Sequence, residues 1–251
     1  MTTISATALE GLPEIRAGDD PAALIASALD GHELADDDVI VVAHKLISKA
    51  EGATRRLSDV HPGERALALA AALDKDPRHV QVVLDQTREV RRAQNGVLIT
   101  VTHHGFVCAN AGVDASNAPD DDTVITLPVD PDDSARRLRA GLRERTGSRP
   151  AVVITDSFGR AWRTGQCDVA IGCAGLEPLD DWRGRADIRG RELHATVIAV
   201  ADELAAAADL ARSKDAMQPA ILVRGAGRWV TDDDGPGIAP LLRDPERDLF
   251  R

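Results

Sequence analysis

Short apolar runs, each followed directly by polar residues, are the clearest pattern in this chain. Residues 39–43 (VIVVA), the start of 98–117 (LITV) and 152–155 (VVIT) are rich in β-branched side chains, which is typical of buried strands. Further strands are expected over 4–9 and 219–227. Apolar residues at helical spacing predict helices over 21–31, 61–76, 77–92, 133–147 and the second half of 192–214. A polar loop and a short tail helix are expected over 232–251.

Helices and strands are interspersed along the chain without strict alternation. The G-x-G-x-x-G turn of a dinucleotide-binding Rossmann unit does not occur in the sequence. This order favours an α+β fold of two interlocked lobes of mixed sheet and helices, not a Rossmann fold. No internal repeat or low-complexity linker divides the chain, so we expect residues 1–251 to form a single functional unit. The arginines of 133–147 are expected on a solvated helix face.

The composition is that of a globular protein with an acidic balance. Of 251 residues, 43% are hydrophobic, 28% are charged and 2% are aromatic, and the net charge is −11. An acidic chain with few stacking side chains is not expected to bind nucleic acid. The N-terminus has no signal-peptide pattern, and no apolar run reaches the roughly 20 residues of a membrane span. We therefore expect a cytoplasmic protein with no membrane partner.

The positions of cysteine and histidine argue against a structural metal site. Cys108, Cys167 and Cys173 form no C-x-x-C pair, which indicates a reduced chain without structural zinc. Cys167 could serve as a nucleophile, although a small buried residue that fills the core is the favoured interpretation. His103 and His104 are adjacent on a predicted strand, so their side chains would point to opposite faces and could not share one ion.

Oxygen donors follow two of the predicted strands. Asp156 and Ser157 come directly after one buried run, and Asp114 and Asn117 lie at the end of the β-rich run 98–117. Such groups suit a divalent cation that holds a phosphate chain. An aspartate that merely caps a turn would explain either position taken alone.

Lysines follow a third predicted strand. Lys45 and Lys49 come after 39–43, with Ser48 and Gly52 close by, and lysines at a strand end suit a polyphosphate. The spacing is not that of a P-loop, so a solvated helix start is an equal explanation here. Because three such junctions occur in one chain, the sequence predicts a phosphoryl-transfer site.

Five blocks of the sequence, in order between residues 11 and 225, resemble the coenzyme F-420-0:L-glutamate ligases. The blocks are GLPEIRAGDD, VVAHKLISKAEG, GFVCANAGVDASN, ITDSFGRAWRTGQCDVAIG and DWRGRADIRGRELHATVIAVADELA. The likeness is strongest to the N-terminal ligase half of the two-domain actinobacterial form. No C-terminal reductase half is expected, and hence no oxidoreductase activity.

The resemblance implies an acid–amino-acid ligase of F-420 biosynthesis. GTP would phosphorylate the carboxylate of F-420-0, and L-glutamate would displace the phosphate, with GDP as the nucleotide product. The resemblance further implies two divalent cations, Mg²⁺ or Mn²⁺, allows a monovalent cation such as K⁺, and implies a homodimer. For the dimer, the Ala-rich segments 66–73 and 205–211 are expected to offer flat apolar faces.

Site residues are carried over from the family motifs one at a time. Asp114 and Asp156 match the ligands of a first metal ion, and Ser157 stands where a hydroxyl meets a second. Lys49 is expected to join these two carboxylates in catalysis. The nucleotide contacts implied by the resemblance are Leu12, Pro13, Glu14, Ile15, His44, Lys45, Lys49 and Asn117.

The chain departs from the family pattern at 211–218. Archaeal members carry a Gly- and acid-rich nucleotide loop there, whereas this chain has Arg212, Lys214 and Asp215, which leaves the remaining ligand of the second ion unassigned. Several arginines are candidates for the coenzyme phosphodiester and for glutamate, although surface solubility explains many of them equally well. They are Arg160, Arg163, Arg183, Arg185, Arg189 and Arg191.

Two other functions remain compatible with the sequence. One is an amide ligase that acts on a different phosphorylated small molecule. The other is a non-catalytic module that binds a nucleotide or a deazaflavin, but binding alone would not require both Asp114 and Asp156.

Overall fold

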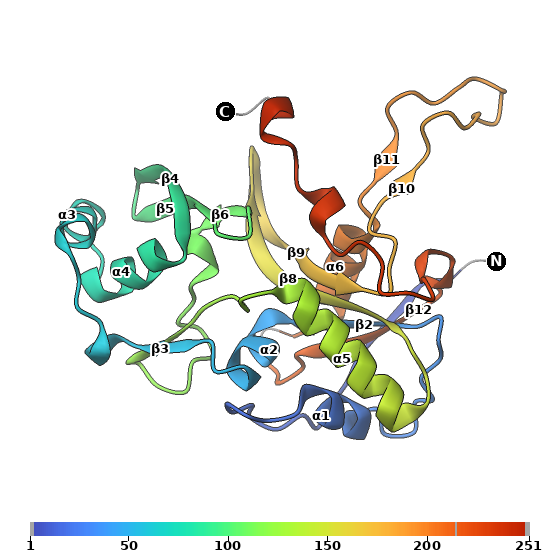
Figure 1. Ribbon diagram of the computed structural model, residues 1–251, viewed down its shortest axis with the longest axis horizontal. Helices are drawn as coiled ribbons and strands as arrows, with labels where there is room; N and C mark the ends of the chain where they lie inside the picture. Colours follow the sequence, from blue (N-terminus) through green and yellow to red (C-terminus); the bar gives the residue numbers. More distant parts are fainter. Residues whose placement is uncertain (1–2, 214, 249–251) are drawn as a thin grey trace.

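The computed structural model describes residues 3–213 and 215–248, and they form two lobes with separate cores (Figure 1). The larger lobe holds a five-stranded sheet in the order β1-β12-β2-β8-β9. Its strands are β1 (Ser5–Ala8), β12 (Ala220–Arg224), β2 (Val39–Ala43), β8 (Ala151–Arg160) and β9 (Arg163–Ala174). β2 and β8 run parallel, and the other neighbours are antiparallel.

Helices cover both faces of this sheet. α1 (Pro21–Ala28) packs on α5 (Pro131–Thr146) over one face, and α6 (Val200–Ala211) covers the other (Figure 1). The side chains of Val39 to Val42 in β2 are therefore fully buried on both faces, which explains why this strand is a continuous apolar run. α2 (His44–Ala50) follows β2 without a loop.

The smaller lobe is formed by the chain between α2 and α5. β3 (Thr54–Arg56) and β7 (Thr123–Ile125) pair where the chain enters and leaves it. Its other elements are η1 (Leu57–Asp59), α3 (Glu64–Leu73), α4 (Pro77–Asp85), β4 (Thr87–Gln94), β5 (Val97–Thr102), β6 (Val107–Ala109) and η2 (Asn110–Gly112). The expected α+β fold of two lobes is thus confirmed.

A long arm projects from the larger lobe (Figure 1). Its base is the two-residue pair of β10 (Asp180–Asp181) and β11 (Val197–Ile198). After β12, the described part of the chain continues in short 3₁₀ turns, η3 (Gly227–Trp229), η4 (Ala239–Leu241) and η5 (Pro245–Arg247). Up to residue 248 no α-helix follows β12, and residues 249–251 of the expected tail helix lie outside the described residues. Among the described helices, none has both the length and the apolar composition that a membrane span requires.

The predicted helix over 77–92 is wrong in its second half. α4 ends at Asp85, and Thr87–Gln94 forms β4, which pairs with β5 across a hairpin. The hairpin turns at Asn95 and Gly96, both with positive φ (53° and 72°), the conformation for which an Asn-Gly pair is favoured. Almost all of β4 is polar and exposed, so its sequence lacks the apolar alternation of a half-buried strand.

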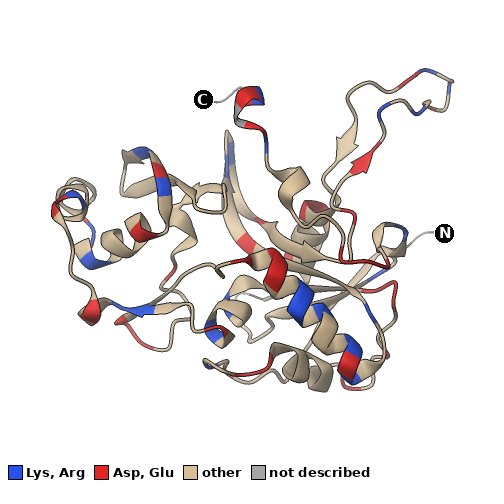
Figure 2. Ribbon diagram, in the orientation of Figure 1, with Lys and Arg blue, Asp and Glu red and all other residues tan. Residues whose placement is uncertain are grey.

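Two smaller expectations also fail. Basic residues do line α5 (Figure 2), but Arg139 is buried rather than solvated, at 1% exposure. His103 and His104 lie in the turn after β5, not on a strand. They still contact different groups, since the Nε2 atoms lie 3.0 Å from the carbonyl oxygen of Asp85 and 2.9 Å from that of Pro128, respectively.

Candidate active site

One cavity of about 1130 Å³ brings the three predicted junctions together. Its wall includes the turn before α1, the start of α2, the segment after η2, β8 with β9, and the connection from α6 to β12. Every predicted nucleotide and metal residue except Leu12, which is buried in the main core, contributes to it. These residues are Pro13, Glu14, Ile15, His44, Lys45, Lys49, Asp114, Asn117, Asp156 and Ser157.

Lys45 joins the two lobes inside the cavity. Its Nζ donates to Asp114 Oδ2 and to Ser116 Oγ, both at 2.5 Å. Burial alone would raise the pKa of the Asp114 carboxyl, but the hydrogen bonds from Lys45 and Ser116 outweigh it and hold that pKa below its usual range. Asp114 is therefore an ionised carboxylate at neutral pH, fixed in place by a lysine from α2.

Lys49 lies one turn further along α2. It is 9% exposed, and its Nζ donates to Glu14 Oε1 at 2.5 Å, which connects α2 to the turn before α1. The Glu14 side chain is 53% exposed, so this ion pair forms at the cavity rim and a ligand can replace the carboxylate.

Asp156 has a different environment from Asp114. Its side chain is 16% exposed, Oδ1 accepts the Ser157 amide at 2.8 Å, and His44 Nε2 lies 3.4 Å away. His44 is buried, with Nδ1 3.2 Å from Ser48 Oγ and no hydrogen-bond partner for Nε2. Among the described residues, no lysine or arginine forms an ion pair with Asp156.

The sequence placed Asp156 and Ser157 in a loop, but both lie within β8. The strand continues to Arg160 because β9 pairs with it over its whole length, with Ser157 opposite Asp168. This pairing builds a buried group around Asp168, which is 1% exposed. Its carboxylate accepts from Thr155 Oγ1 at 2.9 Å, from Ser157 Oγ at 2.5 Å and from Arg212 Nη1 at 3.0 Å.

Three ion pairs line the cavity wall. Lys45 pairs with Asp114, Lys49 with Glu14 and Arg212 with Asp168. Asp156 differs from these carboxylates, because it is largely buried, faces His44 and pairs with no lysine or arginine in the part of the chain that the structure describes. Such a group is a natural ligand for a cation supplied from solution.

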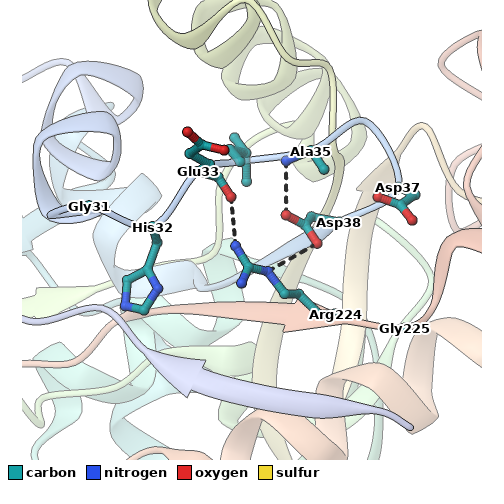
Figure 3. Close-up of a pocket in the computed structure, with 9 residues that line it drawn as sticks. Gly31, His32, Glu33, Ala35, Asp37, Asp38, Arg224 and Gly225 are labelled. Atoms are coloured by element: carbon teal, nitrogen blue, oxygen red, sulfur yellow. Dashed lines mark hydrogen bonds and ion pairs between the residues drawn. The ribbon is translucent and has the colours of Figure 1, made fainter. Parts of the chain in front are cut away.

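A second pocket, of about 600 Å³, lies at the far end of β12 (Figure 3). The Arg224 guanidinium sits between the carbonyl oxygen of Glu33, at 2.6 Å, and Asp38 Oδ1, at 3.5 Å. Asp38 Oδ2 also accepts the Ala35 amide at 2.9 Å. Because these groups form hydrogen bonds and an ion pair with one another, we interpret this pocket as a structural contact between β12 and residues 33–38.

Comparison with known proteins identifies the family. The family model described as F420-0:Gamma-glutamyl ligase matches residues 11–225. The chain belongs to this family. It is 45% identical over 251 residues to the coenzyme F420:L-glutamate ligase of Methanothermobacter thermautotrophicus, which covers 99% of both chains. It is also 45% identical to the enzyme of that name from Haloarcula marismortui (97% of this chain, 94% of the relative) and 41% identical to that from Methanocaldococcus jannaschii (88% and 87%).

The two carboxylates expected to hold a first metal ion, Asp114 and Asp156, are placed where a cation could be bound together with substrate. Asp114 comes from the smaller lobe and Asp156 from the larger, and both line the cavity. Over residues 3–213 and 215–248, no three His, Cys, Asp or Glu side chains form a metal-binding group by themselves. Mg²⁺ is typically held by one or two carboxylates and completes its shell with water and phosphate oxygens, so two carboxylates are sufficient.

The expected second metal position has only one described oxygen donor. Ser157 Oγ donates its hydrogen to Asp168 and keeps its lone pairs, while the Asp168 carboxylate is itself paired with Arg212. Lys214 lies outside the described residues. The Asp215 carboxylate accepts from Ser213 Oγ, and among the described residues neither belongs to a metal-binding group.

The candidate coenzyme arginines fall into two groups, neither of which lines the cavity. Arg160 and Arg163 lie at the outer end of the β8–β9 hairpin, opposite each other. The other candidates are on the projecting arm, where Arg183 pairs with Asp181 and Arg185 packs on the ring of Trp182 at 4.9 Å.

Sequence reasoning missed the role of Thr155, Gln166, Asp168 and Arg212, all of which line the cavity. The signal for Asp168 was available, because its spacing from Ser157 is that of a hairpin with a two-residue turn and a bulge. Arg212 is separated from Asp168 by forty-four residues, and only the packing of α6 against the sheet brings it there. Cys167 is on β9 outside the described cavity wall, and it is half-buried rather than the buried core residue expected from the sequence.

Proposed function

We propose that this protein is a GTP-dependent ligase that joins L-glutamate to coenzyme F-420-0 and releases GDP and phosphate. The observation that carries the proposal is the charge pattern of the cavity, in which lysines of α2 and carboxylates of both lobes meet around Asp156, which pairs with no described lysine or arginine. The names of the relatives, coenzyme F420:L-glutamate ligases that the chain matches over most of their length, support the same reaction.

The reaction forms one bond at a time. An oxygen of the lactyl carboxylate of F-420-0 attacks the γ-phosphorus of GTP, the bond to the β-phosphate oxygen breaks, and GDP leaves. The glutamate amine then attacks the acyl carbon of the resulting acyl phosphate. The carbon–oxygen bond to phosphate breaks, the nitrogen loses a proton, and an amide and inorganic phosphate result.

Lys45 and Lys49 are the groups proposed to bind the nucleotide phosphates. Both amines face carboxylates at the cavity wall, and both belong to one helix, so their spacing is fixed. A phosphate oxygen that displaces Glu14 from Lys49 would gain a charge-assisted hydrogen bond in a partly buried site. His44, Asn117 and the turn residues Pro13, Glu14 and Ile15, which line the cavity, complete the proposed nucleotide contacts. Leu12, buried in the core, would support this turn from behind.

Divalent cations are proposed because every substrate is anionic. Two unit charges of the same sign about 4 Å apart repel by roughly 4 kcal/mol at an effective dielectric constant of ~20. Asp114 and Asp156 would hold the first Mg²⁺ or Mn²⁺, and such an ion supplies charge neutralisation to the transferred phosphoryl group when bound. The second divalent ion, at Ser157, and a monovalent ion such as K⁺ remain proposals that no described contact supports.

A homodimer is proposed from the family resemblance. The small side chains of the expected faces, Ala66 and Ala70 of α3 and Ala205 and Ala208 of α6, are buried inside the chain. Leu67 and Leu210 remain exposed on the outer faces of the same helices. Sedimentation at micromolar concentration should give twice the chain mass of 26.7 kDa, and a monomer would contradict the dimer.

Mass spectrometry of F-420-0 incubated with the protein, L-glutamate, GTP and Mn²⁺ tests the function. We expect one glutamyl adduct for each GDP released, and no more than one GDP per active site when F-420-0 or L-glutamate is omitted. An adduct formed only with a different phosphorylated acid would indicate the alternative amide ligase. Nucleotide binding without any turnover would indicate a binding module.

A further inference from the structure

The outer end of the β8–β9 hairpin has features that the proposed reaction does not use. Trp162, at its tip, is 80% exposed, although aromatic residues make up only 2% of the chain. Its φ of +59° is the left-handed conformation that tight hairpin turns use, and a tryptophan is an unusual residue in that conformation. Arg160 and Arg163 flank it as a cross-strand pair.

The cavity face of the hairpin continues past Ser157 towards this tip. Thr155 and Ser157 both donate to Asp168, so they share a face of β8, and Gly159 is the next residue on that face. Gly159 pairs with Gln166, which lines the cavity. From Ser157 to Arg160 the strand advances by roughly 10 Å, at ~3.3 Å per residue.

The surface above Gly159 is open. A Cβ atom added there would meet no other atom within 4 Å, and the φ of Gly159 is not positive, so this position does not need glycine for its backbone. The Arg160 guanidinium is held by the Thr164 carbonyl oxygen at 3.1 Å. Figure 2 shows basic residues at the end of this hairpin, away from the acidic residues at its base.

We propose that residues 159–166 bind the far end of the coenzyme, with Trp162 stacked on its planar ring and Gly159 leaving room for the chain between the ring and the reacting end. This inference rests on the proposed function, since it requires the reacting carboxylate of F-420-0 to lie at Asp156 and Ser157. A ligand that is reactive at one end and aromatic at the other matches the order of Ser157, Gly159 and Trp162 along the hairpin.

The test measures dissociation constants for three probes, F-420-0, a lactyl phosphate that lacks the ring, and GTP. Trp162→Ala should weaken F-420-0 binding about tenfold or more and change the other two constants less than about twofold. Trp162→Phe should retain F-420-0 affinity within about threefold. Gly159→Val, which covers the open surface, should weaken F-420-0 binding without lowering the melting temperature.

Trp182→Ala is the matched control, because Trp182 lies among the arginines of the arm. The inference is wrong if Trp162→Ala and Gly159→Val bind F-420-0 like wild type, or if all three probes weaken equally. It is also wrong if only Trp182→Ala loses affinity, since the arm would then hold the ring. A wild-type protein that binds GTP but no F-420-0 would instead refute the proposed function, and this inference with it.

Discussion

Asp114 and Asp156 lie in one cavity but in opposite electrostatic settings. Asp114 is paired with Lys45 and 44% exposed, whereas Asp156 is 16% exposed and faces His44. In the ligand-free protein, the Asp114 carboxylate is therefore stabilised by an ion pair with a lysine, whereas the Asp156 carboxylate is not. The charge of Asp156 is best explained by the binding of a cation.

Asp156→Asn should lower ligase turnover by about 100-fold or more, because the amide keeps the shape but removes the charge that a divalent cation needs. The double variant Asp114→Asn with Asp156→Asn should have a turnover only slightly lower than that of either single variant, because two ligands of one ion act as a unit. The melting temperature of Asp156→Asn should not fall. A variant with normal turnover and Mn²⁺ dependence would exclude Asp156 from the metal site.

Asp114→Asn should destabilise the protein only at pH values at which the native Asp114 carboxylate is ionised. The folded-state pKa of Asp114 is below its unfolded value, so its ion pair stabilises the fold above about pH 4 and loses this effect as the pH falls through the folded pKa. Urea unfolding should show a deficit of less than about 1 kcal/mol at pH 7 that shrinks towards pH 3. A deficit that grows in acid would contradict the pairing with Lys45.

Asp168→Asn tests the buried pair behind Ser157. The change leaves the Arg212 guanidinium buried beside a neutral amide, and breaking a buried ion pair in this way costs about 3–5 kcal/mol. The double variant Asp168→Asn with Arg212→Met should recover part of that loss in urea unfolding. The Arg212→Met single variant completes the comparison. If the stability lost in the double variant equals the sum of the losses in the two single variants, the two side chains are not coupled in the folded protein.

At the scale of elements, the sequence predicted the polar segments that follow buried strands. It did not predict which strands pair with one another. The apolar run of β2 predicted both the strand and the start of α2 that presents Lys45 and Lys49. In contrast, β8 was expected to end at Asp156, because the sequence turns polar there. Its continuation depends on β9, whose outer half is equally polar, and the two are joined by backbone pairing and by the hydrogen bonds of Thr155 and Ser157 to Asp168.

Arg139 shows how a helix and the C-terminal segment are held together. From α5 it donates to the carbonyl oxygens of Pro150, Thr231 and Asp233, at 2.7–3.0 Å, and to Asp234 Oδ1. Arg139→Met should cost about 3 kcal/mol or more in urea unfolding, because it leaves buried acceptors unpaired. Arg143→Met, at an exposed position on the same helix, should change stability by less than about 0.5 kcal/mol. Equal effects of the two changes would refute this role.

At the scale of the molecule, the cavity exists because the chain leaves the large lobe after α2 and returns before α5. This path places Asp114, from the small lobe, against Lys45, sixty-nine residues earlier in the sequence. Composition and periodicity predicted two lobes and an acidic, ligand-binding protein. They could not predict which charges neutralise one another, because that depends on contacts between distant segments.

The central claim is that an acyl phosphate forms from F-420-0 and GTP in this cavity. The most direct measurement uses F-420-0 labelled with ¹⁸O in its lactyl carboxylate, incubated with the protein, GTP, L-glutamate and Mn²⁺. We predict that one labelled oxygen appears in each inorganic phosphate released, because the carboxylate oxygen that attacks GTP leaves with the phosphate. Phosphate without label, or amide formed in the absence of GTP, would contradict the account.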